Sequence, residues 1–452
     1  MLGQVISGTV LGIDAHLVKV EVHLEGGEPR FVTVGLPDGA VRESKERVQA
    51  AVKNSGFHIP PKKVTVNLAP ADIRKEGAGF DLPMAVGIIA ALDEVEGPRL
   101  QEYVLLGELS LDGTVRPIHG VLPISVAVVK SRYKGVIVPH ENAREAAMAG
   151  DLQVIPVRSL AETVQFLNGE IEIQRFQINL ADIFSRNRIY REDFSDVKGQ
   201  HHVKRALEVA AAGGHNIVMI GPPGSGKTML AKRLPTILPD MSLAEALETT
   251  KIHSVAGLLP TSDALIATRP FRTPHHTISD AGLIGGGGIP KPGEVSLAHH
   301  GVLFLDELPE FKKNVLEVMR QPLEDGRVTI ARASLSLTYP AEFMLAAAMN
   351  PCPCGYYTDP TNQCNCPGPV IQRYLARISG PLLDRIDIHI EVPAVKYKEL
   401  AKQSDGECSA EIRKRVEAAR RVQRQRFSRH SRLFCNARME SRDLRTYCTI
   451  DA

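Results

Sequence analysis

The sequence contains no tryptophan, and aromatic residues make up only 5% of its 452 positions. It has no apolar run of the roughly 18 residues that a transmembrane helix needs, and its first residues lack the basic-then-apolar pattern of a secretory signal. Its seven cysteines are odd in number and lie only between Cys352 and Cys448, which is not the pattern of a secreted disulfide framework. We therefore expect a cytoplasmic protein with reduced thiols and no membrane partner.

A large net charge is also missing, because 54 Lys and Arg nearly balance 52 Asp and Glu, for a net charge of +2. This excludes a uniformly basic surface of the histone kind, but the sum hides a local excess. Residues 410–445 hold twelve Lys and Arg against four Asp and Glu, a net charge of +8 that leaves −6 for the rest of the chain. Such a stretch suits contact with a DNA backbone, or else it is the solvated face of a helical domain. Its basic residues are Arg413, Lys414, Arg415, Arg420, Arg421, Arg424, Arg426, Arg429, Arg432, Arg438, Arg442 and Arg445.

The chain does have the composition of a globular protein, 43% hydrophobic and 23% charged, and its length favours about three domains. Residues 1–170 alternate β-type runs with helical stretches, which predicts an α/β domain. We expect a linker over 171–197, a second α/β block over 198–395 and a helical segment over 396–452, with Ser409 as the N-cap of its first helix. The strands expected in the first domain are 18–22, 31–34, 64–68, 103–106 and 136–138, and the helices are 40–54, 82–92 and 141–149.

The most specific motif is a phosphate loop, formed by Gly221, Pro222, Pro223, Gly224, Ser225, Gly226, Lys227 and Thr228. Glycines let backbone N–H groups turn inward around phosphates, Lys227 would reach the β- and γ-phosphates, and Thr228 would ligate Mg²⁺. The context agrees, because an apolar strand over 216–220 precedes the loop and a helix over 228–234 follows it. The sequence therefore predicts ATP and Mg²⁺ as cofactors.

Two further strands end in polar residues that an NTPase needs. The apolar run 302–305 ends at Asp306 and Glu307, which predicts a carboxylate that holds Mg²⁺ and a second one that orients or deprotonates the attacking water. The run 343–349 ends at Asn350, which would contact the γ-phosphate or the water, or else simply forms a turn before Pro351.

With these motifs the block 198–395 resembles the AAA+ ATPases of the magnesium-chelatase group, and more narrowly the ComM/YifB subfamily. The resemblance is carried by the phosphate loop and by the segments 269–279 (RPFRTPHHTIS), 304–311 (FLDELPEF), 350–355 (NPCPCG) and 378–387 (ISGPLLDRID). It implies ATP hydrolysis in a homo-oligomeric ring, a hexamer, with Asn350 as the sensor-1 residue and Arg385 as the arginine finger, for which Arg377 competes. It also implies a DNA motor, a helicase that branch-migrates DNA in recombination or natural transformation. The alternative is a chelatase-type ATPase that remodels a protein partner for metal insertion.

The first domain resembles the Lon-protease fold, on the segments 80–87 (FDLPMAVG) and 107–120 (GELSLDGTVRPIHG). By this resemblance the catalytic serine would stand at Met84 and the catalytic lysine near Leu122, and neither side chain can form a Ser-Lys dyad. We therefore expect a non-proteolytic domain that serves as a scaffold or binds nucleic acid. Together the predicted architecture is a Lon-like α/β domain, an AAA+ core and the start of a helical lid. The family lid would continue beyond Ala452, and no sensor-2 arginine is identified.

Four cysteines form two close pairs, Cys352 with Cys354 and Cys364 with Cys366. Four thiolates can close a tetrahedral zinc site, although the spacing is tighter than the usual CxxC, and reduced thiols that stiffen a loop are the alternative.

The segment 269–279 and the glycines 285–288 are expected to form a loop and a hairpin. There Arg272, His275 and His276 would touch a strand threaded through a ring, or else they are solvated surface residues.

Overall fold

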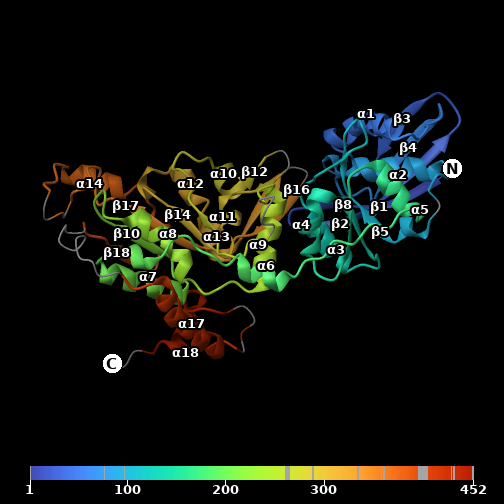
Figure 1. Ribbon diagram of the computed structural model, residues 1–452. Coiled ribbons are helices and arrows are strands. Elements are labelled where there is room, and N and C mark those ends of the chain that lie inside the picture. Colours follow the sequence, from blue (N-terminus) through green and yellow to red (C-terminus); the bar gives the residue numbers. More distant parts are fainter. Residues whose placement is uncertain are drawn as a thin grey trace. The chain divides into compact units, whose positions relative to one another are not determined.

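The computed structural model describes residues 2–75, 77–95, 97–259, 265–287, 290–332, 335–357, 359, 362–394, 406–428, 430 and 433–449 (Figure 1). The chain forms two compact units, Met1–Asn187 with Thr250–Leu265, and Arg188–Thr249 with Ile266–Ala452. Among the described residues, no helix combines the length and the apolar character that crossing a membrane requires. Arg429, Arg432 and Gly288, which the sequence analysis singled out, lie outside the described residues.

The first unit is built on a seven-stranded mixed sheet of order β3-β4-β2-β1-β5-β8-β9. Strands β1 and β2 pair antiparallel from Leu2 opposite His23 to Leu11 opposite Asp14, and β1, β5, β8 and β9 run parallel. Its elements are β1 (Leu2–Leu11), β2 (Asp14–Glu25), β3 (Arg30–Val34), α1 (Gly39–Asn54), β4 (Lys63–Ala69), η1 (Ala78–Phe80), α2 (Asp81–Ala91), η2 (Pro98–Gln101), β5 (Tyr103–Leu105), β6 (Glu108–Leu109), β7 (Val115–Arg116), α3 (Val121–Val129), β8 (Gly135–Pro139), η3 (His140–Asn142), α4 (Ala143–Ala147), β9 (Gln153–Val157), α5 (Leu160–Asn168) and α6 (Leu180–Arg186).

Alternating strand residues bury both faces of this sheet. In β8, Ile137 packs into a core with α2 and α5, whereas Val136 and Val138 pack into a second core with α3 and α4. The period of two in a strand makes this division inevitable once helices cover both faces. Met84 and Leu122 are fully buried in these helices, so the positions of a Ser-Lys dyad hold core side chains.

The second unit contains a five-stranded parallel sheet of order β11-β14-β17-β10-β18. Parallel strands direct all their carboxyl ends to one edge of the sheet, where ligands of such folds bind. Its elements are η4 (Phe194–Asp196), α7 (His201–Gly213), β10 (Ile217–Ile220), α8 (Lys227–Ile237), α9 (Leu243–Ala256), which runs on into the first unit, β11 (Phe271–Arg272), α10 (Asp280–Ile284), β12 (Gly285–Gly286), β13 (Lys291–Pro292), α11 (Glu294–Leu297), β14 (Val302–Leu305), η5 (Leu308–Glu310), α12 (Lys313–Glu317), α13 (Arg320–Asp325), β15 (Arg327–Arg332), β16 (Leu335–Pro340), β17 (Met344–Met349), α14 (Gly368–Leu375), α15 (Gly380–Leu383), β18 (Ile388–Glu391), α17 (Ser409–Arg426), η6 (Asn436–Arg438) and α18 (Ser441–Tyr447).

Two local predictions need correction. The segment 269–279 is not only a loop, because Phe271 and Arg272 form β11, the edge strand of the sheet, and Phe271 stacks on Phe304 at 5.9 Å between ring centroids. Cys408 occupies the N-cap position of helix α17 without a side-chain capping bond, and Ser409 is the first residue of the helix. The side chain of Ser409 accepts from the Phe194 N–H and lies 2.7 Å from the Thr236 hydroxyl, because the helix docks on α7 and α8.

Candidate nucleotide site

The phosphate loop connects β10 to α8 at the carboxyl edge of the five-stranded sheet. Gly224 and Gly226 take positive φ angles of 75° and 89°, which L-residues with a Cβ avoid. Gly221 lies so close to β18 that a Cβ would stand 2.1 Å from the carbonyl oxygen of Val392. The glycines of the motif are therefore required by backbone conformation and by close packing.

Lys227 is buried in the loop at the start of α8. Its Nζ donates to the carbonyl oxygens of Gly221 at 2.7 Å and Pro222 at 2.8 Å, and lies 3.4 Å from Oδ1 of Asn350. Burial lowers the pKa of Lys227, and Asp306 opposes this shift. The ammonium group is thus held by neutral carbonyl oxygens, which the negatively charged oxygens of a phosphate can replace.

Thr228 and Asp306 form the second part of the site. The Thr228 hydroxyl donates to Oδ2 of Asp306 at 2.7 Å, although 78 positions separate the two residues. A hydroxyl and a carboxylate at this edge are oxygen ligands of the kind that Mg²⁺ prefers, so the donor set fits the predicted ion. Glu307 follows in a left-handed conformation with φ 53°, which turns it away from the strand direction, and its Oε2 lies 3.5 Å from Nδ1 of His276.

Asn350 follows β17, the strand between β10 and β14, so its side chain reaches Lys227 from the neighbouring strand end. Beside it, burial raises the pKa of Tyr374 to about 12, with Glu310 adding to the shift and the Asn350 backbone opposing it. The structure therefore brings Lys227, Thr228, Asp306 and Asn350 together.

Sequence reasoning missed Gln200, which lies just before α7. Its Nε2 donates to the carbonyl oxygens of Ser225 at 2.8 Å and Pro393 at 3.1 Å, so it ties the phosphate loop to the end of β18. A lone Gly-Gln dipeptide offers no pattern from which this contact could be inferred.

The two arginine candidates do not join this cluster. Arg385 donates to Oε1 of Glu324 from Nε at 3.0 Å, and Arg377 donates to Oε2 of Glu310 at 2.8 Å. Their side chains are 41% and 51% exposed, so both are accessible from solvent.

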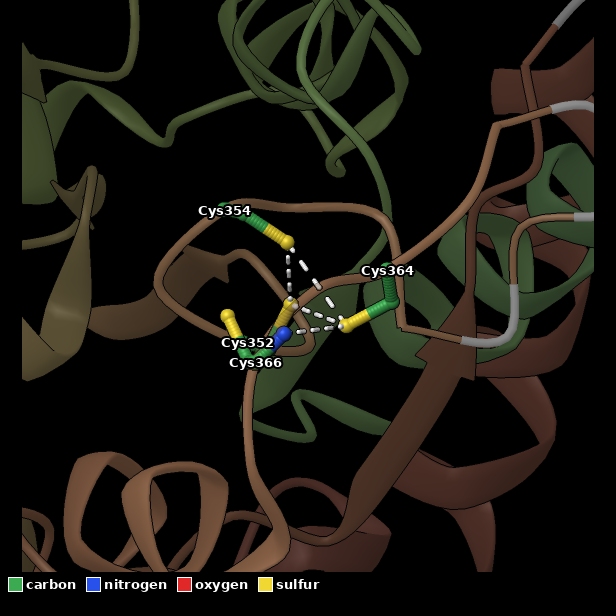
Figure 2. Close-up of side chains that lie close together, drawn as sticks. All are labelled: Cys352, Cys354, Cys364 and Cys366. Carbon is green, nitrogen blue, oxygen red and sulfur yellow. Dashed lines mark hydrogen bonds between the residues drawn. The ribbon is translucent and has the colours of Figure 1, made fainter.

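The four cysteine sulfurs lie within 4.8 Å of one another (Figure 2). The distances from Cys352 Sγ to Cys354 Sγ, Cys352 Sγ to Cys364 Sγ and Cys354 Sγ to Cys364 Sγ are 3.3, 3.7 and 3.6 Å. A regular zinc tetrahedron with 2.3 Å Zn–S bonds has S···S edges of about 3.8 Å. Backbone N–H groups also donate to Cys352 Sγ and Cys364 Sγ, as suits thiolates. The donor set therefore fits zinc.

The cysteine loop touches the phosphate loop. Gly355 has φ 88°, and a Cβ at this position would stand 2.5 Å from Cδ of Pro223. The four-cysteine cluster is thus linked to the nucleotide site twice, through the contact of Gly355 with the phosphate loop and through Asn350, which lies two positions before Cys352.

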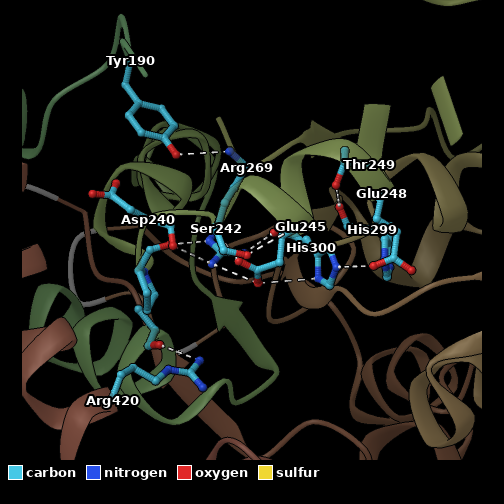
Figure 3. A network of polar contacts seen from close by, with 12 residues as sticks. Tyr190, Asp240, Ser242, Glu245, Glu248, Thr249, Arg269, His299, His300 and Arg420 are labelled. Carbon is cyan, nitrogen blue, oxygen red and sulfur yellow. Dashed lines mark hydrogen bonds and ion pairs between the residues drawn. The ribbon is translucent and has the colours of Figure 1, made fainter. Parts of the chain in front are cut away.

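A polar network occupies the opposite edge of the sheet (Figure 3). The Arg269 guanidinium donates to the carbonyl oxygens of Pro239 at 2.5 Å and His300 at 2.6 Å, and burial lowers its pKa. Arg269 therefore fastens the starts of β11 and β14 and does not face the nucleotide site.

Glu248, His299 and His300 form a second cluster with metal-ligand spacing. Nδ1 of His299 accepts the N–H of Glu342 at 3.0 Å, so the neutral ring carries its proton on Nε2 and points it at Glu248, 3.5 Å away. A protonated nitrogen cannot bind a metal, so His299 offers no ligand atom toward Glu248, and the hydrogen bond of this cluster joins His300 Nε2 and Glu248 Oε2 at 3.2 Å.

The basic stretch near the C-terminus is partly neutralised inside the second unit. Arg413 pairs with Asp240 at 2.8 Å and Arg415 with Glu208 at 2.7 Å, while Lys414 pairs with Glu411 along α17. The first two pairs dock α17 on the core, and all three reduce the charge available to a partner.

The parallel sheet, the phosphate loop after β10, Asp306 after β14 and Asn350 after β17 define an AAA+ P-loop NTPase. Three family models match the chain: magnesium chelatase, subunit ChlI, over 193–400; subunit ChlI of Mg-chelatase over 20–142; and the C-terminal region of that subunit over 406–452.

Proteins similar to this chain point to the same family. Competence protein ComM of Haemophilus influenzae is 44% identical over 456 residues, covering 100% of this chain and 87% of that protein. The uncharacterized protein YifB of Escherichia coli is 42% identical, with 100% and 87% covered. A Lon protease of Trichlorobacter lovleyi is 25% identical over 165 residues, or 34% of this chain and 20% of that protein. The chain therefore belongs to the ComM/YifB subfamily of magnesium-chelatase-like AAA+ ATPases, with a Lon-like first domain.

Proposed function

We propose that this protein is a Mg²⁺-dependent ATPase that drives a ring-shaped DNA motor in recombination or natural transformation, in the cytoplasm. The observation that carries the ATPase part is the convergence of Lys227, Thr228 and Asp306, with the Thr228 hydroxyl 2.7 Å from Asp306. The DNA part is supported by the similarity to a protein named competence protein ComM. Bound Mg²⁺ would neutralise phosphate charge, while Lys227 holds the phosphates, Glu307 orients the attacking water and Asn350 positions it.

Two β-hairpins of the second unit supply candidate DNA contacts. Strands β12 and β13 form one and β15 and β16 the other, and the Tyr339 hydroxyl of β16 donates to the Pro290 carbonyl at 2.7 Å, which joins them. Arg332 lies against Gly286, where a Cβ would be 3.3 Å from its Nη2. Exposed Lys291, Arg327 and Arg332 thus gather on one pair of hairpins, as phosphate contacts require.

The proposed ring needs residues from two subunits at each site. If Arg385 is an arginine finger that acts on the neighbouring subunit, Lys227→Ala and Arg385→Ala should each be inactive alone but regain ATPase activity when mixed. The reason is that some interfaces of the mixed ring pair an intact phosphate loop with an intact arginine. The same result for Arg377→Ala in place of Arg385→Ala would assign the finger to Arg377. No recovery with either variant would overturn a site shared between subunits.

We also propose that Cys352, Cys354, Cys364 and Cys366 hold one structural Zn²⁺. Elemental analysis should find about one zinc per chain, lost in Cys364→Ser and kept in Cys448→Ser, since Cys448 is exposed and outside the cluster. Absence of stoichiometric zinc in the unmodified protein would refute the site.

The central experiment measures ATP hydrolysis with and without single-stranded or branched DNA. Glu307→Gln should lose most hydrolysis but still bind ATP, and Glu192→Gln, an exposed carboxylate of the same unit, should behave as wild type. DNA should stimulate the wild-type rate. Hydrolysis without any DNA binding at low salt would refute the DNA motor and favour the chelatase-type alternative.

A further inference from the structure

A cavity of about 510 Å³ opens in the first unit, between helix α1 and the edge strand β3. Its helical wall carries Lys45, Gln49 and Lys53, which are spaced by four residues and so share one face of α1. Its other walls come from the start of β3, at Arg30 and Phe31, and from the segment 57–64. We call it the α1–β3 pocket.

The α1–β3 pocket is strongly basic. Arg30, Lys45, Lys53 and Lys62 line it together with His58, and no carboxylate belongs to its described lining. Lys45 has a surface ion pair with Glu46 at 3.3 Å, whereas the described part of the chain supplies no ion-pair partner for Arg30 or Lys53, both exposed. In a chain whose net charge is only +2, this is a concentrated positive site.

Aromatic side chains lie beside these cations. Phe31 and Phe57 are half-buried and pack on the core of the unit, which leaves them rigid and partly open to the pocket. Rigid aromatic faces next to cations match an unpaired nucleic-acid strand, whose bases stack while its phosphates pair with Lys and Arg. From Lys45 to Lys53 the helix rises about 12 Å, a distance of the order of a few nucleotides.

We infer that the α1–β3 pocket binds single-stranded nucleic acid, as a contact site separate from the ATPase core. The inference does not depend on the proposed function, since no residue of the pocket belongs to the nucleotide site. An acidic peptide that pairs with the open edge of β3 is the competing occupant. The phenylalanines favour the nucleic acid, because a peptide backbone would need the edge N–H groups and not the aromatic faces.

The contribution of the basic residues to strand binding is tested by fluorescence anisotropy at several salt concentrations, with the full-length chain and a labelled oligothymidylate. Arg30→Glu with Lys53→Glu should weaken binding at least tenfold and reduce the log–log salt slope by about 1.4, at 0.7 for each lost phosphate contact on a single strand. Lys130→Glu, at an exposed lysine of the same unit outside the pocket, should change affinity less than twofold. Equal losses in both variants would show a non-specific charge effect and overturn the inference.

Stacking is tested with Phe57→Leu, which keeps an apolar side chain but removes the ring. Affinity should fall at least fivefold with an unchanged salt slope. Because the ATPase core also binds DNA in the proposed function, photo-crosslinking with an iodouracil-substituted strand locates the contact, and labelled peptides from residues 29–64 are expected. Crosslinks that map only outside residues 29–64 would overturn the inference. It would also be overturned if polyglutamate displaced the strand completely and Phe57→Leu left the affinity unchanged. ATPase activity without DNA should be unchanged in every pocket variant. The strand-binding test is therefore independent of whether the ATPase experiment supports the proposed function.

Discussion

Ser409 is expected to fasten helix α17 to the ATPase core through a buried chain of hydrogen bonds. The Phe194 N–H donates to its Oγ at 2.9 Å, and the Ser409 and Thr236 hydroxyls lie 2.7 Å apart. Thr236 donates onward to the carbonyl of Arg233 at 2.7 Å, so the Ser409 proton points to Thr236 and both its donor and acceptor roles are used. Ser409 is 2% exposed and Thr236 1%, and water cannot replace these bonds.

Ser409→Ala should therefore cost about 2 kcal/mol, because it leaves the buried Phe194 N–H without an acceptor. Hydrogen exchange measures the free energy of local opening, and a local measurement is needed because the two units of the chain need not unfold together. Peptides covering 194–197 and 409–426 should exchange roughly 30-fold faster, at 1.4 kcal/mol per factor of ten. Ser428→Ala, at an exposed position just after α17, is the matched control and should leave the rates unchanged.

A double-mutant cycle with Thr236→Val tests whether the two hydroxyls act through one shared hydrogen bond. The two single changes should not add, because each removes the same Ser409–Thr236 bond. Additive effects, or a Ser409→Ala rate equal to that of Ser428→Ala, would refute the reasoning.

Three further predictions concern Gly355, Thr228 and Glu248. Gly355→Ala should raise the KM for ATP several-fold and lower thermal stability, because its Cβ would meet Pro223 at 2.5 Å and φ is positive, whereas Gly368→Ala, with open space around its Cβ, should do neither. Thr228→Ala should shift the Mg²⁺ concentration needed for half-maximal ATPase upward at least tenfold, and an unchanged Mg²⁺ profile would contradict the assigned ligand. The neighbouring rings of His299 and then His300 hold the pKa of Glu248 far below its usual 4.5, so its contribution to stability is present above about pH 4.5 and lost as pH falls below it. Melting temperatures of Glu248→Gln should therefore decline less between pH 5 and pH 3 than those of the wild type, and parallel curves would refute this.

Local patterns in the sequence were sufficient for much of this structure. The phosphate loop, its flanking strand and helix, and the apolar runs that end at Asp306 and Asn350 all follow from contiguous residues, since the glycine spacing and the apolar run are local properties. The Lon-like fold and the ComM/YifB membership were also correctly predicted, on motifs that stay contiguous along the chain.

Only the tertiary structure decided which distant residues meet. The order of strands in the sheet places Thr228 against Asp306 and Asn350 beside Lys227, and the adjacency of parallel strands cannot be read from any one strand. Ser409, predicted as the N-cap of its helix, is instead the first residue of α17, and its buried side chain accepts from the Phe194 N–H of a segment more than 200 positions away.

The charges of the protein are likewise set partly by the sequence and partly by the fold. The sequence by itself determined that an excess of +8 stands near the C-terminus. The fold decided that Arg413 and Arg415 of that stretch pair with Asp240 and Glu208 of the core, and that a basic pocket free of carboxylates in its described lining forms around Lys53 instead. The physical reason is that a charge acts over a few ångströms of space, and folding sets those distances independently of separation along the chain.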